Sequence, residues 1–363
     1  MHTQAAVVRE AGGNYLLEDL DIGAPLAHEV LVHVVAVGHC HTDVIGRLGL
    51  AGAPVPIVLG HEGAGIVEAT GPDVTEVAVG DHVVLSFSSC HRCDQCLFGH
   101  PAACSEFVPR NASGYRADGT TPLRDPSGAA VAGRWFGQSA FSSYCIADIT
   151  GVVKVDDDLP LEQLAPLGCG VQTGAGAVFN VLRPNAGGSV AVFGVGAVGL
   201  SAILAAVVAG CETIVAVDKD ARRLDLATKL GATATLISGD GLLERLKDAT
   251  SGGVESALDT TANSDVLECA LSSLRPRGTL GLVGLGAPSI SAAALGGSKT
   301  VVGITEGDAI PQVFLPRLIS LWKQGRFPFD LMSACYPLAE INRAEQDAIE
   351  GGVVKPILLP EPR

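Results

Sequence analysis

The first half of the chain contains short runs in which hydrophobic and polar residues alternate, separated by glycine and proline. Examples cover residues 30–37, 65–69 and 82–87. Short alternating runs between turn-forming residues are typical of strands that bury one face. Residues 1 to about 165 are therefore predicted to form an irregular, mostly antiparallel β domain. Within it, 105–133 is rich in turn-forming and charged residues without a period and is predicted to be a long surface loop.

From about Pro166 the pattern changes to apolar strand-length runs that alternate with helix-length segments. The predicted strands cover 189–193, 213–217, 235–238, 256–260 and 279–283. The predicted helices between them cover 198–209, 221–230, 242–249 and 265–273. Strands and helices in alternation form a doubly wound parallel sheet. Near Gly303 the pattern changes again, and the tail is predicted to return to the first domain.

Length and composition narrow the class of protein. A chain of 363 residues with 47% apolar content suits two domains with well-filled cores. The formal net charge of −15 disfavours nucleic acid as a partner, because an acidic surface repels phosphates. No apolar run reaches the roughly 18–20 residues that span a bilayer, and residues 1–10 lack the features of a signal peptide. The sequence thus predicts a soluble cytoplasmic protein with neither a membrane nor a nucleic-acid partner.

A glycine-rich turn joins the predicted strand 189–193 to the predicted helix that follows it. In its G-x-G-x-x-G spacing, Gly194 permits the tight turn, Gly196 lets the backbone approach a pyrophosphate, and Gly199 lets the helix pack on the strand. The helix N-terminus then offers N–H groups to the phosphates. The same turn without a ligand is the alternative, which the flanking strand and helix disfavour.

Asp218, at the end of the next predicted strand, indicates which dinucleotide would bind. Its carboxylate can accept hydrogen bonds from both ribose hydroxyls of NAD, and it would repel the 2′-phosphate of NADP. Lys219, Arg222 and Arg223 follow closely and could attract that phosphate. On balance the sequence predicts NAD.

Four of the ten cysteines share one short segment with the spacing Cys90-x-x-Cys93-x-x-Cys96-x7-Cys104. Four thiolates at this spacing suit a closed tetrahedral zinc site, which crosslinks a loop and leaves no position open for a substrate. Free or disulfide-linked cysteines are the alternative, which a cytoplasmic location disfavours. A structural zinc is therefore predicted here.

Three further residues that can bind zinc are dispersed along the chain, namely Cys40, His61 and Cys169. Two thiolates and one imidazole leave the fourth position of a tetrahedral ion open, which is the arrangement of a catalytic zinc. From their spacing alone, the three could equally be unrelated buried residues.

Taken together, these motifs resemble those of the zinc-containing medium-chain alcohol dehydrogenases, and among them most the bacterial aryl-alcohol (benzyl alcohol) dehydrogenases. The similarity covers nearly the whole chain and includes the segments 136–141, 167–174, 306–308, 325–329 and 355–356. The resemblance implies an α/β protein with a GroES-like irregular β catalytic domain at 1–170, a structural-zinc lobe at about 88–106 within it, a Rossmann cofactor domain at 171–304, and a C-terminal return to the catalytic domain at 305–363.

The resemblance also assigns roles to single residues. The three dispersed residues fall on the ligands of the catalytic zinc. Glu62 falls on a glutamate that assists ligand exchange, Asp43 on the carboxylate that holds the ligand imidazole, and Thr42 on the hydroxyl that receives the alcohol proton. Cofactor contacts are implied beside the nicotinamide at Thr173 and Val198, at the adenosine ribose at Arg223, and also at Val283 and Lys355.

The implied reaction interconverts a primary alcohol and its aldehyde by hydride transfer to NAD, with one catalytic and one structural zinc per subunit. Relatives carry a histidine three residues after the threonine to pass the proton on, whereas this chain has Ile45 there. We hypothesise that His41, at the position of a phosphate-binding arginine in relatives, contacts the cofactor phosphates and takes part in the proton relay. Phosphate contact alone is the alternative.

Three aromatic residues, Phe87, Trp135 and Phe136, fall near positions that line the alcohol pocket in the family. In a chain with few aromatics, this concentration favours a flat or unsaturated substrate. Benzyl-type alcohols are expected first, and allylic terpenoid alcohols such as geraniol or perillyl alcohol next.

Other functions and the assembly remain open at this point. A glutathione-dependent formaldehyde dehydrogenase carries a basic residue where this chain has Val108, although Arg110 is close. A non-catalytic relative that binds NAD and zinc is the alternative from a different class. The resemblance further implies a homodimer through an edge strand near 299–304, with a homotetramer as the other possibility.

Overall fold

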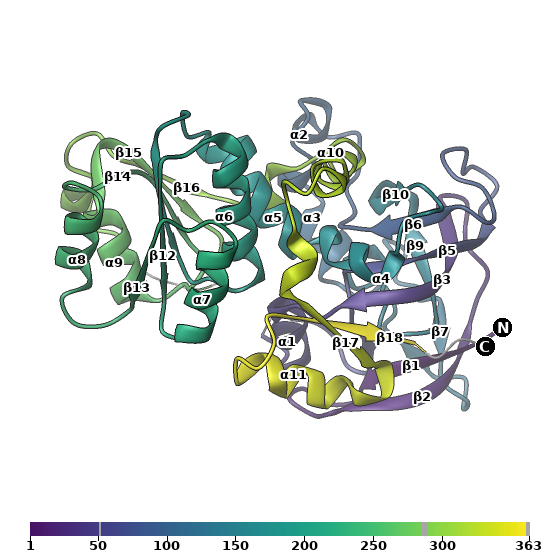
Figure 1. The fold of residues 1–363 in the computed structure, drawn as a ribbon. Helices are drawn as coiled ribbons and strands as arrows, with labels where there is room; N and C mark the ends of the chain where they lie inside the picture. Colours follow the sequence, from purple (N-terminus) through teal and green to yellow (C-terminus); the bar gives the residue numbers. More distant parts are fainter. Residues whose placement is uncertain (51, 285, 287–288, 361–363) are drawn as a thin grey trace. The chain divides into compact units, whose positions relative to one another are not determined.

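The computed structural model describes residues 1–50, 52–284, 286 and 289–360, and the chain divides into two compact units (Figure 1). The first unit comprises Met1–Cys169, Ile310–Pro316 and the segment from Ser333 onward, and the second comprises Gly170–Ala309 and Arg317–Met332. Residues 317–332 thus pack within the second unit, whereas the sequence placed all of 305–363 with the first domain. Among the described residues, no helix combines the length and the apolarity that crossing a bilayer requires.

The first unit contains two mostly antiparallel sheets. The five-stranded sheet has the order β4-β1-β2-β7-β8, with bounds Ile57–Val58, His2–Val8, Tyr15–Ile22, Leu123–Arg124 and Ala130–Val131. The seven-stranded sheet has the order β10-β6-β5-β3-β18-β17, and β9 pairs with β3. Its strands, in that order and ending with β9, are Val152–Lys154, His82–Leu85, Gly63–Thr70, Glu29–Gly38, Lys355–Leu359, Ser333–Pro337 and Tyr144–Asp148. Side chains from both sheets, including Leu20 and Ile146, share one hydrophobic core.

Short helices connect these strands. They are α1 (His41–Arg47), α2 (Asp94–Leu97), α3 (Phe107–Asn111), α4 (Leu161–Leu164) and α11 (Ile341–Ile349). The single turns are η1 (Pro101–Ala103), η2 (Trp135–Gly137), η3 (Ile149–Gly151), η4 (Ala165–Gly168) and η9 (Leu338–Glu340). Helix α10 (Pro311–Lys323) contains residues of both units.

The segment 105–133, predicted to be a long surface loop, contains short regular elements. It contains α3 and the strands β7 and β8, and β7 pairs with β2. Leu123 and Val131, one from each strand, are buried. Strands of two residues and a helix of five are too short to show a hydrophobic period, so the pattern along the chain could not indicate them.

The second unit contains a six-stranded sheet in which all pairings are parallel. Its order is β13-β12-β11-β14-β15-β16, with bounds Ala234–Ile237, Thr213–Asp218, Ser189–Phe193, Val254–Asp259, Leu274–Leu282 and Thr300–Gly303. This is the doubly wound order of a Rossmann domain. The predicted strands and helices of this region are confirmed to within a few residues at most boundaries, although β15 begins five residues before the predicted 279.

Helices cover both faces of this sheet, with α6 and α7 on one face and α8 and α9 on the other (Figure 1). Their bounds are Ala197–Ala209, Ala221–Lys229, Leu242–Ala249 and Ser264–Ser272. The remaining elements of the unit are α5 (Gly170–Gly176), η5 (Ala177–Leu182), η6 (Ala292–Leu295), η7 (Glu306–Asp308) and η8 (Phe329–Met332). Helix α6 is almost entirely small and apolar and buries most of its length against the sheet.

Candidate metal and cofactor sites

The three dispersed residues of the first unit, together with Glu62, come together in space. Cys40, His61, Glu62 and Cys169 each place a possible ligand atom within 4.8 Å of those of the others. Cys40 is the N-cap of α1, His61 and Glu62 lie between β4 and β5, and Cys169 follows η4. His61 and Glu62 are fully buried. The fold therefore brings two thiols, one imidazole and one carboxylate to one point.

The donor set of this cluster fits zinc. The Nδ1 of His61 lies 2.8 Å from the Oδ1 of Asp43, and because a carboxylate oxygen only accepts, Nδ1 donates to it and Nε2 is the ring nitrogen left for a metal. That Nε2 atom is buried and has no hydrogen-bond partner among the described residues. A hydrogen bond with Cys169, aided by the charges of Lys355 and His61, holds the pKa of the Cys40 thiol well below its usual range despite burial. Two soft thiolates and an imidazole suit a zinc ion with an open fourth position.

Asp43 organises the surroundings of His61. Its carboxylate is fully buried, and Oδ1 accepts hydrogen bonds from the Nδ1 of His61, from the backbone of Gly60 at 3.0 Å and from the indole Nε1 of Trp135 at 3.1 Å. Oδ2 accepts from the backbone of Cys40 at 3.2 Å. The bond from Trp135 was not anticipated from the sequence, which placed Trp135 only in the alcohol pocket.

The aromatic residues assigned to the pocket are all buried. The ring of Phe136 stacks on the imidazole of His61, with centroids 4.5 Å apart. The ring of Phe87 instead meets Phe107, at 5.7 Å. The contact with His61 brings the face of one aromatic ring to the metal cluster.

Glu62 forms a buried ion pair with Lys355 of β18. The ammonium donates to both carboxylate oxygens, at 2.9 and 2.8 Å, and to the carbonyl of His39 at 3.1 Å. Burial alone would lower the pKa of Lys355, but the charge of Glu62 outweighs it and raises that pKa. The structure thus places the amine of Lys355 against Glu62, while its assignment to the cofactor stays a prediction.

Helix α1 carries the residues assigned to proton transfer. Thr42 is half-buried in the first turn, with its hydroxyl 3.9 Å from the Cys40 sulfur. His41 is exposed at the first position of the helix, and Ile45 lies one turn after Thr42. The described contacts leave the relay role of His41 a hypothesis.

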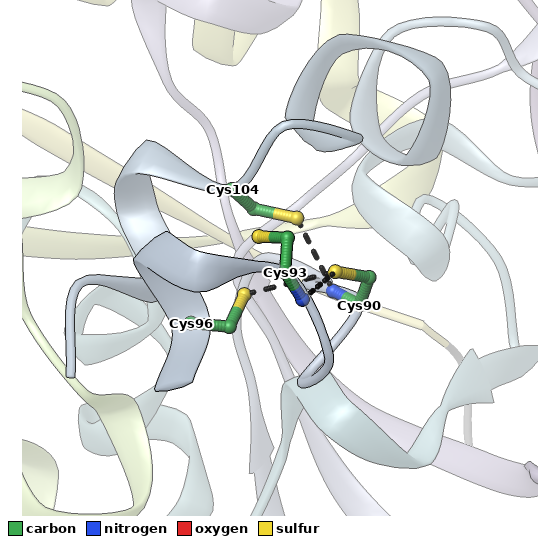
Figure 2. Close-up of side chains that lie close together, drawn as sticks. All are labelled: Cys90, Cys93, Cys96 and Cys104. Carbon is green, nitrogen blue, oxygen red and sulfur yellow. Dashed lines mark hydrogen bonds between the residues drawn. The ribbon is translucent and has the colours of Figure 1, made fainter. Parts of the chain in front are cut away.

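The cysteine lobe of the first unit forms a second cluster. Figure 2 shows Cys90, Cys93, Cys96 and Cys104 converging, and their sulfurs lie within 4.8 Å of one another. All four are free thiols. Backbone N–H groups donate to two of the sulfurs, from Cys93 to Cys90 at 3.3 Å and from Cys90 to Cys104 at 3.3 Å. Backbone N–H groups of Cys96 and Ser105 lower the pKa of the Cys93 thiol to about 5. Four converging thiols, two of which accept backbone hydrogen bonds at sulfur, fit a structural zinc.

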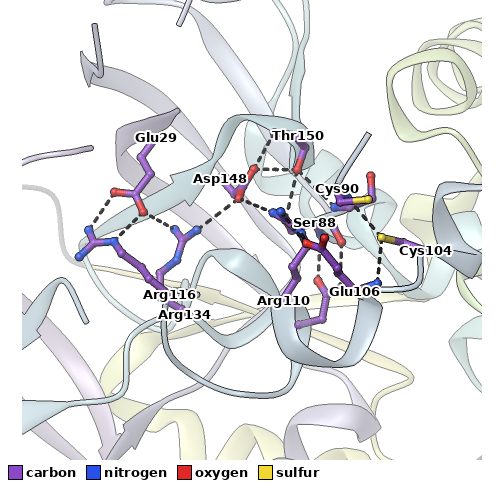
Figure 3. A network of polar contacts seen from close by, with 12 residues as sticks. Glu29, Ser88, Cys90, Cys104, Glu106, Arg110, Arg116, Arg134, Asp148 and Thr150 are labelled. Carbon is purple, nitrogen blue, oxygen red and sulfur yellow. Dashed lines mark hydrogen bonds and ion pairs between the residues drawn. The ribbon is translucent and has the colours of Figure 1, made fainter. Parts of the chain in front are cut away.

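A chain of charges connects this lobe to the β strands of the same unit (Figure 3). Near the lobe, the backbone N–H of Glu106 donates to the sulfur of Cys104, and its carboxylate binds Arg110. Arg110 also pairs with Asp148 at 3.5 Å. Asp148 in turn lies 3.6 Å from the guanidinium of Arg134.

The chain of charges ends at Glu29 on β3. Arg116 donates to both oxygens of its carboxylate, at 2.7 and 2.8 Å, and the buried Arg134 lies 3.6 Å away. Burial would raise the pKa of Glu29, but the bond to Arg116 and the charge of Arg134 outweigh it and lower that pKa.

Glu29→Gln is expected to lower the free energy of unfolding by about 2 kcal/mol at pH 7, the usual range for hydrogen bonds to a charged group. Because the pKa of Glu29 is lowered on folding, its ion pairs stabilise the protein above about pH 4.5 and are lost as the pH falls through the folded-state value. Urea unfolding at pH 7 and at about pH 4 measures the difference. If the difference in free energy of unfolding between wild type and Glu29→Gln is as large at about pH 4 as at pH 7, the ion pairs of Glu29 are not its source.

The glycine turn of the second unit has the shape of a phosphate cradle. Gly194 has a φ of +83°, and a Cβ there would lie 2.4 Å from the hydroxyl of Thr260. A Cβ on Gly199 would lie 2.0 Å from the carbonyl of Gly194, so only glycine lets α6 pack this closely. A Cβ on Gly196 would meet nothing within 4 Å, which leaves open space beside the N-terminus of α6. The residues present therefore fit a pyrophosphate.

Asp218 ends β12 beside this turn and is buried. Its Oδ2 accepts the backbone N–H of Val195 at 2.8 Å, and its Oδ1 accepts that of Asp220 at 3.0 Å. Each oxygen keeps a lone pair for a ribose hydroxyl. Asp218 therefore both holds the glycine turn and presents acceptors at the end of the strand.

The other predicted cofactor contacts lie on neighbouring elements of the second unit. Helices α5 and α6 approach closely, since a Cβ on Gly174 would lie 2.0 Å from the carbonyl of Val198. Thr173 on α5 bonds Glu306 at 3.5 Å, and Gln172 bonds the same carboxylate at 3.1 Å. No role for Glu306 was predicted, because neither its burial nor its contacts with α5 can be read from the local sequence pattern.

Two further predicted contacts are half-buried. Val283 continues from β15, with its N–H bonded to the carbonyl of Asp259 at 3.0 Å. Arg223 lies in the first turn of α7, after Asp218. Contact of either residue with a cofactor remains a prediction.

Comparison with known proteins gives matches along the chain. Residues 26–157 match the family of the alcohol dehydrogenase GroES-like domain, and residues 197–322 match the zinc-binding dehydrogenase family. A geraniol dehydrogenase of Castellaniella defragrans is 45% identical over 98% of this chain and 97% of its own.

Two solved structures are similar throughout. An alcohol dehydrogenase zinc-binding domain protein from Burkholderia ambifaria has a TM-score of 0.97 at 47% identity, over 99% of this chain and 100% of that one. The benzyl alcohol dehydrogenase from Acinetobacter calcoaceticus has a TM-score of 0.95 at 43% identity, with the same coverage. These matches confirm the GroES-like and Rossmann architecture that the sequence predicted.

Proposed function

Because the chain belongs to the zinc-dependent alcohol dehydrogenases, we propose that it oxidises a primary aryl or allylic alcohol to the aldehyde with NAD, at a zinc ion bound by Cys40, His61 and Cys169. The observation that carries this proposal is the buried Nε2 of His61. It lacks a hydrogen-bond partner among the described residues and belongs to the cluster of two thiols. The lobe cysteines would hold the second, structural zinc.

The residues of the site support this chemistry. A zinc ion bound there would lower the pKa of a bound alcohol, as it lowers that of water from ~15.7 to about 7. The hydroxyl of Thr42 would accept the alcohol proton. The side chain of Ile45 cannot pass this proton on. We therefore assign to the exposed His41 the transfer of the proton to solvent, together with a contact to a cofactor phosphate. Asp43 would keep the imidazole of His61 in the tautomer that binds metal.

An unsaturated substrate is supported from two directions. The relatives include a geraniol dehydrogenase and a benzyl alcohol dehydrogenase, whose named substrates are an allylic and an aryl alcohol. The Phe136 ring lies on the imidazole of His61, so an aromatic surface adjoins the metal cluster.

Steady-state kinetics with benzyl alcohol, geraniol, hexanol and hydroxymethylglutathione, each with NAD and NADP, test the proposal. We expect kcat/KM for the two unsaturated alcohols to exceed that for hexanol by about tenfold or more, equal to ~1.4 kcal/mol. Preference for hydroxymethylglutathione would favour the formaldehyde alternative. Two bound zinc ions without reduction of either dinucleotide would favour the non-catalytic one.

Asp218→Asn is expected to lower the ratio of kcat/KM for NAD to that for NADP by about a hundredfold, equal to ~2.7 kcal/mol. The variant removes the charge that repels a 2′-phosphate and leaves a side-chain oxygen for the backbone of Val195. Asp225→Asn, which removes an exposed charge from α7, is the control and should leave the ratio unchanged. An unchanged ratio in Asp218→Asn would show that Asp218 does not select the cofactor.

We also propose a cytoplasmic homodimer. Strand β16 lies at the edge of the parallel sheet and pairs with β15 on one side. A second copy could continue the sheet there. The four free thiols of the lobe are typical of a reducing compartment. Sedimentation velocity distinguishes the dimer from a tetramer.

A further inference from the structure

Trp135 touches the helix that carries the catalytic residues at two points. Its indole Nε1 donates to the Oδ1 of Asp43 at 3.1 Å. One turn further along α1, a Cβ on Gly46 would lie 3.0 and 3.2 Å from the Cζ2 and Cη2 atoms of the same indole. The ring is 1% exposed. The indole therefore fills the space above Gly46 and at the same time bonds the side chain of Asp43.

The loop that carries Trp135 is held independently of α1. The backbone N–H of Trp135 donates to the hydroxyl of Ser139 at 2.8 Å, and that hydroxyl donates to the carbonyl of Val58 at 2.6 Å. Before it, Arg134 is buried and donates to the carbonyl of Ile146 at 2.9 Å. An indole fixed from its own side can position α1 rather than merely follow it.

An indole is well suited to this bond. Asp43 receives three N–H groups on Oδ1, and the other two come from His61 and Gly60. Tryptophan donates through one ring N–H and accepts nothing, so it fits a buried carboxylate oxygen. Phenylalanine would fill much of the same volume without the donor. The orientation of Asp43, and through it that of the ligand imidazole, then depends on this third bond.

We propose that Trp135 is a positioning residue of the catalytic metal site, which fixes Asp43 and the first turns of α1 so that the Nε2 of His61 points at the metal. This inference rests on the proposed zinc site. Groups that orient metal ligands typically change metal affinity or activity by about 10–100-fold when they are altered. Trp135 would thus act on zinc retention as well as on the reaction, which a residue that only lines a pocket would not do.

The test is the release of zinc from the intact protein to a chelating dye. In Trp135→Phe, we expect one of the two zinc ions to leave about tenfold faster than in wild type and the other to leave at the wild-type rate. The loss in kcat should be similar for benzyl alcohol and hexanol. If Trp135→Phe releases both zinc ions at the wild-type rate and its loss in kcat/KM differs among alcohols, the proposal is overturned. Trp135 would then only line the alcohol pocket.

The chain contains a matched control. Its only other tryptophan, Trp322 in the second unit, also donates its Nε1 to a carboxylate, that of Asp330 at 2.8 Å. Trp322→Phe removes the same kind of bond and should release both zinc ions at wild-type rates. If Trp322→Phe releases zinc as fast as Trp135→Phe does, the effect reflects a general loosening of the protein, and the proposal is overturned.

A second measurement applies if Trp135→Phe does not fold. In Trp322→Phe, Trp135 is the only tryptophan, and ultraviolet resonance Raman scattering reports the hydrogen bond of its indole N–H. We expect a hydrogen-bonded N–H whose bond weakens when Asp43→Asn is added, and an N–H insensitive to Asp43→Asn would overturn the proposal. If wild type holds zinc only in the lobe, the proposed function fails. If wild type holds both ions and Trp135→Phe does not alter their release, only this inference fails.

Discussion

His61→Ala should reduce the bound zinc from two ions per chain to one and reduce alcohol oxidation below detection. The shift in pKa from ~15.7 to about 7 corresponds to roughly 12 kcal/mol at about 1.36 kcal/mol per unit. No hydrogen bond in the site could replace stabilisation of that size, since such bonds contribute about 0.5–3 kcal/mol. The Nε2 of His61 is buried, has no hydrogen-bond partner among the described residues and belongs to the cluster with Cys40 and Cys169, so its removal takes away one of the three proposed ligands. Elemental analysis and the initial rate of NAD reduction measure both effects.

Two measurements separate loss of the metal from loss of the fold. The second unit contains the glycine turn and Asp218, so NAD should still bind to His61→Ala, which isothermal titration calorimetry measures. His33→Ala, which alters a histidine on β3 beside Tyr144, should keep both zinc ions and the rate. Retention of two zinc ions in His61→Ala, or a measurable rate with one, would refute the assignment of the catalytic metal.

The parallel sheet could be predicted because each of its strands is a local apolar run. Strand β11 begins and ends at the predicted residues, and α6 begins one residue early. The order of the strands follows from the alternation with helices, which permits few topologies. The β domain was predicted only in type. Strands β7 and β8 have two residues each, and their pairing depends on β2, about a hundred residues earlier in the chain.

The sites differ in the same way. The four lobe cysteines lie within fifteen residues, so their spacing alone indicated a metal. Cys40, His61 and Cys169 become a site only when the fold brings three segments together, and the family resemblance supplied that step. The bond from Trp135 to Asp43 spans 92 residues, and the pair of Lys355 with Glu62 spans 293. No local pattern encodes such contacts, because each depends on the packing of complete strands.

Lys355→Met is expected to lower the free energy of unfolding by about 3–5 kcal/mol, the cost of leaving a buried charge without its partner. Glu62 is fully buried, and both of its oxygens bond the ammonium. The carboxylate has little room to turn away, because a Cβ on Gly38 would lie 2.0 Å from its Oε2. Urea unfolding of the zinc-loaded protein without NAD measures the loss.

The double variant Glu62→Gln with Lys355→Met should recover most of that stability, since a neutral pair leaves no buried charge uncompensated. A deficit that persists in the double variant would show that the ion pair is not its source. The same variants test whether Lys355 serves the cofactor. If its main role is to bind NAD, Lys355→Met would weaken NAD binding without destabilising the NAD-free protein. The ammonium of Lys355 already bonds Glu62 and the carbonyl of His39. We therefore expect the loss of stability to appear in the absence of NAD.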